Sequence, residues 1–174
     1  MAGATLTVSL DKLAVERHLQ ALQRRLGSLR DVFDEIGSSL VTSTNKRFED
    51  QAGPDGAAWE PHTATTLLLR AQGGVTGKRQ VFRKDGGLTK RAERTINAAK
   101  ILILSGALQK SITHRPSATQ VQVGTNRVYA AIHQFGGRAG RGKTVEIPAR
   151  PYLGLSDADR NSILVIVTRA LERP

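Results

Sequence analysis

Residues 129–155, YAAIHQFGGRAGRGKTVEIPARPYLGL, carry the most unusual chemistry in the chain and organise the rest of it. The first seven residues are compact and mostly apolar, which favours a short helix over a β-branched central strand. A glycine- and arginine-rich segment follows that is too polar for a core, and VEIPARPYLGL then returns to apolar residues. The pattern predicts a basic loop over residues 136–147 that leaves a packed scaffold and comes back to it.

This loop contains the letters of a nucleotide-binding motif, because residues 137–144, GRAGRGKT, match G-x-x-x-x-G-K-[ST]. In that motif the phosphates lie at the N-terminus of a helix that begins at the Lys-Thr pair and is fed by a buried strand. Here VEI follows Thr144 and favours a strand, and Pro148 blocks a helix. We therefore predict a mobile basic loop. An NTPase is the alternative, and it would lose ATP binding on Lys143→Ala.

Length and composition predict one domain of 174 residues. The chain has no cysteine, which excludes disulfides and thiolate metal sites and favours assembly inside a cell. Its N-terminus, MAGATLTVSL, lacks the regions of a targeting signal, and no apolar run is long enough for a membrane span. We expect a soluble protein that is assembled in the cytoplasm and has no membrane partner.

The formal net charge of +11 is concentrated in two stretches. Residues 70–100 hold nine Lys/Arg and two acids, and residues 136–150 hold four Lys/Arg and one acid. The rest of the chain is nearly neutral. Two cationic segments on a balanced body indicate contact with a polyanion or an acidic protein surface, rather than a uniformly basic nucleic-acid binder. Solvated loops without a partner are the alternative for either segment taken alone.

The N-terminal part predicts a short strand followed by two helices. Residues 5–10 alternate between apolar and polar side chains, as in a strand. Asp11 can cap a helix over residues 11–26, whose apolar positions recur at spacings of four and three. A longer helix follows a capping box at Ser28 and Asp31, with an apolar face formed by Leu29, Phe33, Ile36, Leu40 and Phe48. We expect this helical hairpin to pack against a sheet.

The middle of the chain has a Gly/Pro-rich segment, then a short helical pattern, then a cationic segment. Trp59 lies in a Gly/Pro-rich segment, where it either closes an edge of the core, which we favour, or anchors an interface. Residues 63–71, TATTLLLRA, predict a short helix. Residues 72–95 combine few apolar side chains, several glycines and the first cationic cluster, which predicts an extended mobile arm or hairpin.

The remaining elements alternate between core and turn. The apolar run in residues 101–112, ILILSGALQKSI, predicts a core segment and then a helical turn with Leu108 and Ile112 inward. Residues 114–124 alternate around a Pro-Ser turn and predict a β-hairpin. Ser156 and Asp159 can cap a last helix, up to Glu172. Its β-branched centre would also suit a strand, but acids at its start and arginines at its end favour the helix.

No catalytic or metal-binding group stands out. The four histidines show no i, i+4 pair and no neighbouring carboxylate cluster, so we expect no metal site. His133 could act as a base, but no nucleophile with an oxyanion-hole motif accompanies it. We expect a hydrogen-bonded structural histidine, no cofactor and no enzyme activity.

Four segments, in their order along the chain, resemble the phage virion morphogenesis family, the tail-completion proteins of long-tailed phages. They are Asp55-Gly56 with Trp59 and Pro61, then ILILSGALQKSI, VQVGTNRVYAAIHQFGG and IPARPYLGLSD. The resemblance covers residues 53–62 and 101–159, and YAAIHQFGG with IPARPYLG is its specific part. The basic arm at residues 72–95 departs from the family pattern.

The resemblance implies an α+β fold in a single domain, 1–174. A small mixed or antiparallel sheet would pack with an N-terminal helical hairpin and a C-terminal helix, and long basic loops would project. It also implies a structural virion protein at the head–tail junction, in a ring, commonly hexameric, that completes or terminates the tail and joins it to the neck. Expected partners are further copies, the tail tube protein, neck or connector proteins and channel DNA, bound without sequence specificity.

Two sets of residues are the candidate contacts. An interface with a neighbouring subunit or partner is expected to use Trp59, Tyr129, His133, Phe135, Gly136, Gly137, Arg138, Arg141, Lys143, Arg150, Pro151 and Tyr152. Contacts to DNA or an acidic partner are expected from Lys78, Arg79, Arg83, Lys84, Lys90 and Arg91. The alternative function is a head-side connector or adaptor that contacts DNA through the basic loops.

Overall fold

The computed structural model describes residues 3–8 and 29–172 and has the expected α+β architecture. Strand β1 (Ala4–Val8) confirms the first part of the predicted N-terminal strand. The predicted helix over residues 11–26 and the predicted capping residue Ser28 lie outside the described residues. The long helix α2 (Arg30–Asp50) is confirmed; it starts after Leu29, which makes no side-chain capping hydrogen bond.

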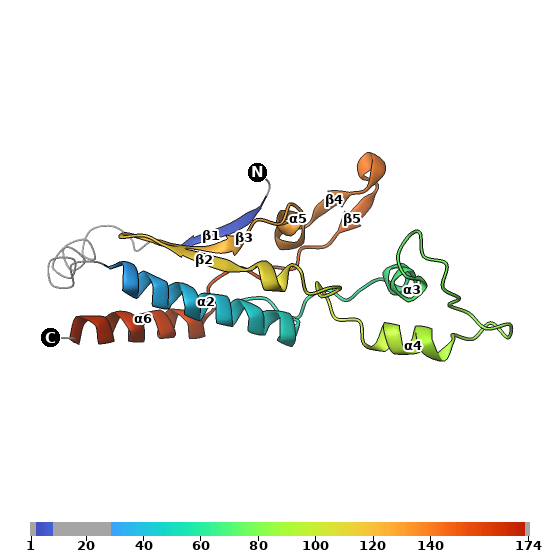
Figure 1. The fold of residues 1–174 in the computed structure, drawn as a ribbon, viewed down its shortest axis with the longest axis horizontal. Helices are drawn as coiled ribbons and strands as arrows, with labels where there is room; N and C mark the ends of the chain where they lie inside the picture. The colour runs from blue at the N-terminus through green and yellow to red at the C-terminus, as the bar shows by residue number, and fades with distance from the viewer. Residues whose placement is uncertain (1–2, 9–28, 173–174) are drawn as a thin grey trace.

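Helix α2 forms the middle layer of the body. A three-stranded sheet covers one side of it, and α6 (Asp157–Glu172) covers the other (Figure 1). The predicted apolar face of α2 is buried, because Phe33, Ile36, Leu40 and Phe48 are each at most 3% exposed. Phe48 ends this row in an aromatic cluster, with ring centroids 5.5 Å from Trp59 and 5.4 Å from Tyr152.

The sheet is antiparallel, with the strand order β1-β3-β2. The predicted hairpin is confirmed as β2 (Thr113–Pro116) and β3 (Val121–Thr125). Strand β1 pairs with the other edge of β3, with Ala4 opposite Thr125. Val121 and Val123 point into the core, and so do Leu108 and Ile112, which flank the helical turn η1 (Gln109–Ser111) as predicted.

The C-terminal helix α6 begins with the predicted capping box. The Asp159 N–H donates to Ser156 Oγ at 3.1 Å, and the Ser156 N–H donates to Asp159 Oδ2 at 2.8 Å. Ile163 and Ile166 turn inward from this helix and join the core. The helix assignment is confirmed, so burial of one face and a satisfied N-terminus outweigh the strand preference of its β-branched residues.

Gly37 lets α2 lie directly against the sheet. A Cβ atom built there would be 2.5 Å from His114 Cδ2 and 2.8 Å from Val121 Cγ2, and Val121 is fully buried. We expect Gly37→Val to lower the free energy of unfolding by about 1–3 kcal/mol, the usual range for overpacking. Denaturant unfolding measures the change. Ser38→Val, at the next and exposed position of α2, is the control, and equal losses in the two variants would contradict this account.

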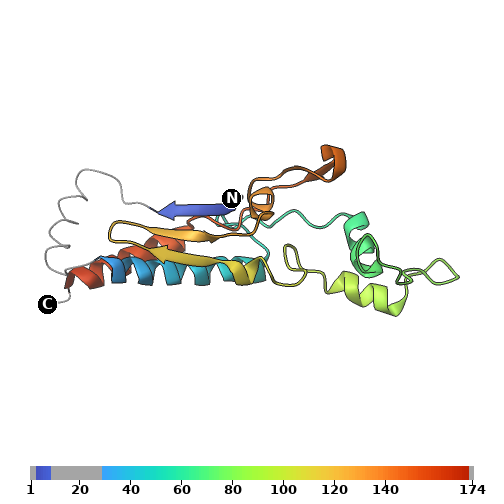
Figure 2. The same ribbon diagram turned by 45° about the horizontal axis from the view of Figure 1, so that its top comes forward.

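Residues 61–100 form a lobe that projects from one end of the body (Figures 1 and 2). Its helices, α3 (Ala64–Gln72) and α4 (Lys90–Asn97), pack on each other, and each is capped by a threonine, Thr63 or Thr89. The predicted helix over residues 63–71 is confirmed. The predicted extended arm at residues 72–95 is wrong beyond Thr89, where helix α4 begins. Most side chains of α4 are cationic or polar, and Ala92 is the one that is buried, inside the lobe.

The apolar run at residues 101–104 is less buried than its composition predicts. Ile101, Leu102 and Ile103 are partly buried against the core, but Leu104 is 80% exposed. The chain turns here, with Leu102 at a φ of 58°, so consecutive side chains cannot all face inward. In the described ranges, no helix is long and apolar enough to cross a membrane.

Candidate partner-binding surface

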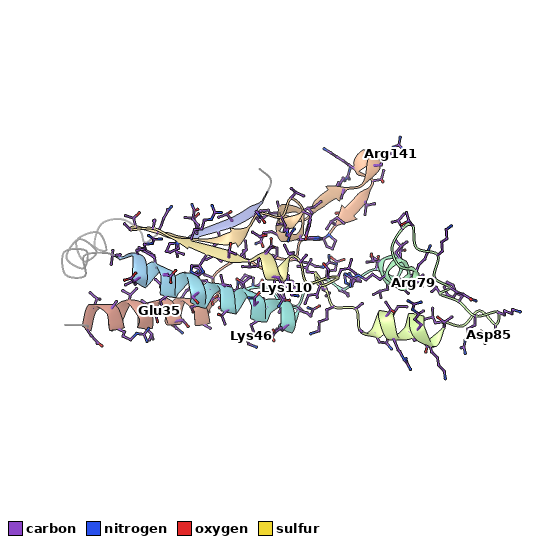
Figure 3. The ribbon with its side chains drawn as sticks, in the orientation of Figure 1. Glu35, Lys46, Arg79, Asp85, Lys110 and Arg141 are labelled. Carbon is purple, nitrogen blue, oxygen red and sulfur yellow. The ribbon has the colours of Figure 1, made fainter. Side chains whose placement is uncertain are left out.

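The glycine- and arginine-rich segment is a β-hairpin rather than a loop. Strands β4 (Gly137–Ala139) and β5 (Val145–Ile147) pair antiparallel, and a tight turn, η2 (Arg141–Lys143), joins them. The hairpin extends from α5 (Ala130–Phe135) away from the body, and Arg141 lies at its outer end (Figure 3). The predicted helix before Gly137 and the predicted strand after Thr144 are both confirmed.

The hairpin does not have the geometry of a phosphate-binding loop. Lys143 and Thr144 lie in the turn and are followed by β5, and no helix begins there. The strand that should precede the motif is replaced by α5. The N-terminal helix dipole and the row of helical N–H groups that bind phosphates are therefore missing from this segment. The letters of the Walker A motif match, but their structural context does not.

Gln134 fastens the returning chain to α5. Its Oε1 accepts hydrogen bonds from the N–H groups of Tyr152 and Leu153, both at 3.0 Å, and its Nε2 donates to the Leu153 carbonyl at 2.9 Å. The Arg150 N–H donates to the His133 carbonyl at 2.8 Å. Gly136 allows this close approach, because a Cβ there, at a φ of 73°, would lie 2.9 Å from the Ala149 nitrogen.

Three of the candidate interface residues contribute buried side chains to the base of the hairpin. Trp59 is 5% exposed, and its Nε1 donates to the Pro151 carbonyl at 2.9 Å. Arg150 is 6% exposed, and its guanidinium donates to the Glu60 and Pro61 carbonyls. Tyr152 is fully buried, and its hydroxyl donates to the Ala130 carbonyl at 3.2 Å. The core interpretation of Trp59 is confirmed, and these side chains support the surface from beneath.

Other candidates lie on the surface of α5. Tyr129 is 40% exposed and Phe135 is 74% exposed, and the Tyr129 and His133 rings meet edge to face with centroids 6.0 Å apart. His133 Nδ1 is buried without a hydrogen-bond partner among the described residues, so the prediction of a hydrogen-bonded histidine is wrong for this atom. Burial, together with the charge of Arg150, lowers the pKa of His133, so its ring is neutral near pH 7.

The candidate cations divide into two projections. Arg138, Arg141 and Lys143 lie on the hairpin, and all three are exposed and form no ion pair with a described residue. The other set lies on the lobe, where Arg83 pairs with Asp85 at 3.5 Å and the rest have no such partner: Lys78, Arg79, Lys84, Lys90 and Arg91. The structure thus separates the two sets rather than joining them in one patch (Figure 3).

A group of basic side chains holds the lobe at its connection with the body. His62 Nε2 lies 3.3 Å from the Lys100 carbonyl, and Arg70 donates to the same oxygen at 2.9 Å. Arg150 holds the outgoing chain at Glu60 and Pro61. Burial lowers the pKa of His62, and the charges of Arg70 and Arg150 lower it further despite the hydrogen bond to Lys100. Carbonyl oxygens of the chain thus accept hydrogen bonds from Arg70 and Arg150, and the carboxylate of Glu60 lies close enough to act on Arg150.

A buried ion pair that the sequence does not predict lies beneath this surface. Arg47 of α2 pairs with Asp159 of α6, and its Nη1 donates to the Tyr152 and Gly154 carbonyls, both at 3.0 Å. The side chains of Arg47 and Asp159 are 8% and 5% exposed. Arginine in a helix more often covers a solvated face, so a single sequence carries no signal that this one is buried.

The histidines do not come together. His62 lies at the lobe connection, His133 on α5, and His114 3.0 Å from Asp34 on the face between β2 and α2; His18 lies outside the described residues. Within residues 3–8 and 29–172, no three His, Cys, Asp or Glu side chains are grouped so that they could hold a metal ion.

Comparison with known proteins gives the class of protein. The family model described as "Phage virion morphogenesis family" matches residues 10–91 and 63–172. The "Putative capsid assembly protein G" of Escherichia phage Mu is 31% identical over 163 residues, which cover 90% of this chain and 91% of that protein. The "Mu-like prophage FluMu G protein 2" of Haemophilus influenzae is 56% identical over 57 residues, 33% of this chain and 41% of that protein.

No solved structure matches the chain. The fold and the sequence comparisons together describe a structural or assembly protein of phage virions, with an α+β body. The chain belongs to the phage virion morphogenesis family. The resemblance of YAAIHQFGG and IPARPYLG is thus confirmed at the family level. In the structure these two segments are the halves of one unit, joined by Gln134.

Proposed function

We propose that the chain forms a hexameric ring that completes or terminates the phage tail and joins it to the neck. The supporting observation is the pair of separate cationic projections, the β4–β5 hairpin and the α3–α4 lobe, on a packed and otherwise nearly neutral body. A subunit of a ring needs a rigid body and extensions that reach its neighbours, and such extensions gain from complementary charge. The tail tube protein and the neck proteins are the partners proposed for these extensions.

The hairpin gives the first test of this function. We expect replacement of residues 136–147 by a neutral linker to yield tails that do not join heads, because the reaching segment is lost. A matched variant keeps the hairpin glycines and changes only Arg138→Gln, Arg141→Gln and Lys143→Gln, which separates the loss of charge from the loss of shape. Electron microscopy of assembled particles and of the purified protein with tail tubes measures the result. Normal virions from the linker variant would contradict the proposal.

A head-side connector that contacts DNA is the second candidate. It is favoured by the lobe, where five of the six candidate cations are exposed without an acidic partner among the described residues, and by the capsid-assembly name of the Mu relative. Phosphate contacts would make DNA binding fall steeply with added salt. Salt-dependent DNA binding without affinity for tail tubes would support the connector, and binding to tail tubes alone would support the tail ring.

A further inference from the structure

Exposed apolar side chains gather on two opposite sides of the molecule. One group lies at the hairpin and α5, where Phe135 is 74% exposed and Val145 is 53% exposed. The other group lies on α6, where Leu164 and Val165 are each 64% exposed and Leu171 is 40% exposed. The hairpin extends from one end of the body, whereas α6 runs along the far side of α2 toward the other end (Figures 1 and 2).

The outer side of α6 has an apolar centre and acidic ends. With 3.6 residues per turn, its exposed residues fall on the side opposite Ile163, Ile166 and Ala170, which face the core. We call this side the α6 stripe; it consists of Asp157, Asn161, Leu164, Val165, Thr168, Leu171 and Glu172. It carries a carboxylate near each end. Arg160, at the border of the stripe, lies 3.9 Å from Asp157 in an exposed ion pair, and Arg169, also exposed on α6, pairs with Glu35 of α2. A partner for it must combine apolar and cationic groups.

The hairpin has this combination. The cross-strand pairs Ala139–Val145 and Gly137–Ile147 form its apolar face, and Arg141 and Lys143 in the turn supply positive charge. Arg138 lies opposite Glu146 in the register, on the other face of the hairpin. The hairpin also lacks packing partners among the described residues that would stabilise it, and a two-stranded hairpin by itself is only marginally stable in water. The body offers it no further packing beyond its base, as β4 and β5 contact chiefly each other and the turn between them.

We propose that the β4–β5 hairpin of one copy docks on the α6 stripe of the next copy. In this contact Val145 and Phe135 meet Leu164 and Val165, while Arg141 and Lys143 at the hairpin tip approach the carboxylate at one end of the stripe, Asp157 or Glu172. The contact joins two different surfaces, so it propagates from copy to copy and closes into a ring when the rotation between copies allows. It rests on the ring proposed above and specifies which surfaces form it.

The hollow over the exposed face of the sheet suits the hairpin less well. This hollow, of about 710 Å³, is lined by Thr5, Thr113, Gln122 and other small or polar residues. Its one charged residue is Arg115, which would repel a cationic hairpin, and no carboxylate lines it. Charge complementarity therefore favours the α6 stripe over this hollow.

Cysteine cross-linking tests the contact, because the chain has no native cysteine. Oxidation of the double variant Val145→Cys/Leu164→Cys is expected to give a ladder of covalent oligomers that ends at the size of the ring. A mixture of the two single variants is expected to give dimers only. The control pairs Val145→Cys with Val75→Cys, which lies in the lobe and is 83% exposed, and gives no ladder. Assembled rings without a Val145–Leu164 cross-link would overturn the contact and leave the ring intact.

Charge reversal gives a second measurement on the same surfaces. Asp157→Arg with Glu172→Arg is expected to weaken self-association at least tenfold in analytical ultracentrifugation at low salt. Adding Arg141→Glu and Lys143→Glu is expected to restore part of it. All four positions are exposed, and circular dichroism checks that the variants keep the fold, because Asp157 lies in the first turn of α6, where a carboxylate favours the helix. If the charge-reversed variant associated as strongly as the wild type, the contact would be refuted. Normal self-association and cross-linking by a protein that never binds tail tubes would instead refute the proposed tail function.

Discussion

Asp159→Ala is expected to lower the free energy of unfolding by about 3–5 kcal/mol, the usual cost of removing one partner from a buried ion pair. The change leaves the Arg47 guanidinium buried and without its carboxylate, although the Tyr152 and Gly154 carbonyls still accept from it. It also removes the acceptor of two hydrogen bonds from Ser156 at the start of α6. Denaturant unfolding followed by circular dichroism measures the loss.

Glu49→Ala is the matched control, because Glu49 is an exposed acid close to Arg47 on the same helix. A surface substitution of this kind usually changes stability by no more than about 0.5 kcal/mol. If Asp159→Ala cost as little as Glu49→Ala, the pair would not stabilise the fold. If Asp159→Asn kept most of the stability, hydrogen bonding rather than charge would account for the effect.

The same carboxylate predicts how stability depends on pH. Burial raises the pKa of Asp159, but hydrogen bonds from Ser43 and Ser156 and the charge of Arg47 outweigh burial, so its pKa lies below the ordinary value. A group with a lowered folded-state pKa stabilises the protein above its unfolded pKa, near 3.9 for aspartate, and loses this contribution as the pH falls through the folded value. We expect the stability difference between wild type and Asp159→Ala to be constant from pH 5 to 7 and to shrink below about pH 4.

Gln134→Leu is expected to have the second large effect, a loss of roughly 2–4 kcal/mol. The N–H groups of Tyr152 and Leu153 and the Leu153 carbonyl all lose their side-chain partner. A buried polar group without a partner costs about 1–3 kcal/mol, and relaxation of the segment limits the sum. Denaturant unfolding gives the total, and hydrogen exchange is expected to show faster exchange of the Tyr152 and Leu153 amides.

Gln122→Leu is the control for this variant, because Gln122 is an exposed residue of β3, outside the unit that Gln134 holds together. It should leave both amides protected. Unchanged exchange at Tyr152 and Leu153 in Gln134→Leu would mean that the segment is held by its other contacts, such as the aromatic packing of Tyr152 on Phe48.

Much of the body could be predicted from the sequence, because its signals are local. The apolar spacing of α2, the alternation of β2 and β3 and the reciprocal pattern of Ser156 and Asp159 each lie within one element. Helix α4 was missed since its composition is cationic and only Ala92 is fully buried in it. The sequence predicts a loop where the hairpin lies, because strands β4 and β5 are only three residues long and glycines lie in and between them.

The candidate site was predictable as a region but not as a set of contacts. The segments around His133 and Pro151 are indeed brought together, yet the residue that joins them, Gln134, has no distinguishing pattern. Arg47 and Asp159 are 112 residues apart, and nothing in one sequence relates them. Trp59 and Arg150 are buried because they donate hydrogen bonds to the carbonyls of Pro151 and Glu60, which are about 90 residues away in the chain. Such pairings between distant segments cannot be read from one sequence.

The two ends of the lobe lie side by side where it joins the body. Its outgoing chain at His62 and its returning chain at Lys100 are neighbours, joined through one carbonyl oxygen. A segment with adjacent ends can be deleted, enlarged or exchanged by recombination while the rest of the polypeptide keeps its shape. In this chain, exchange of residues 61–100 for a short turn is therefore expected to leave the underlying scaffold of the body intact.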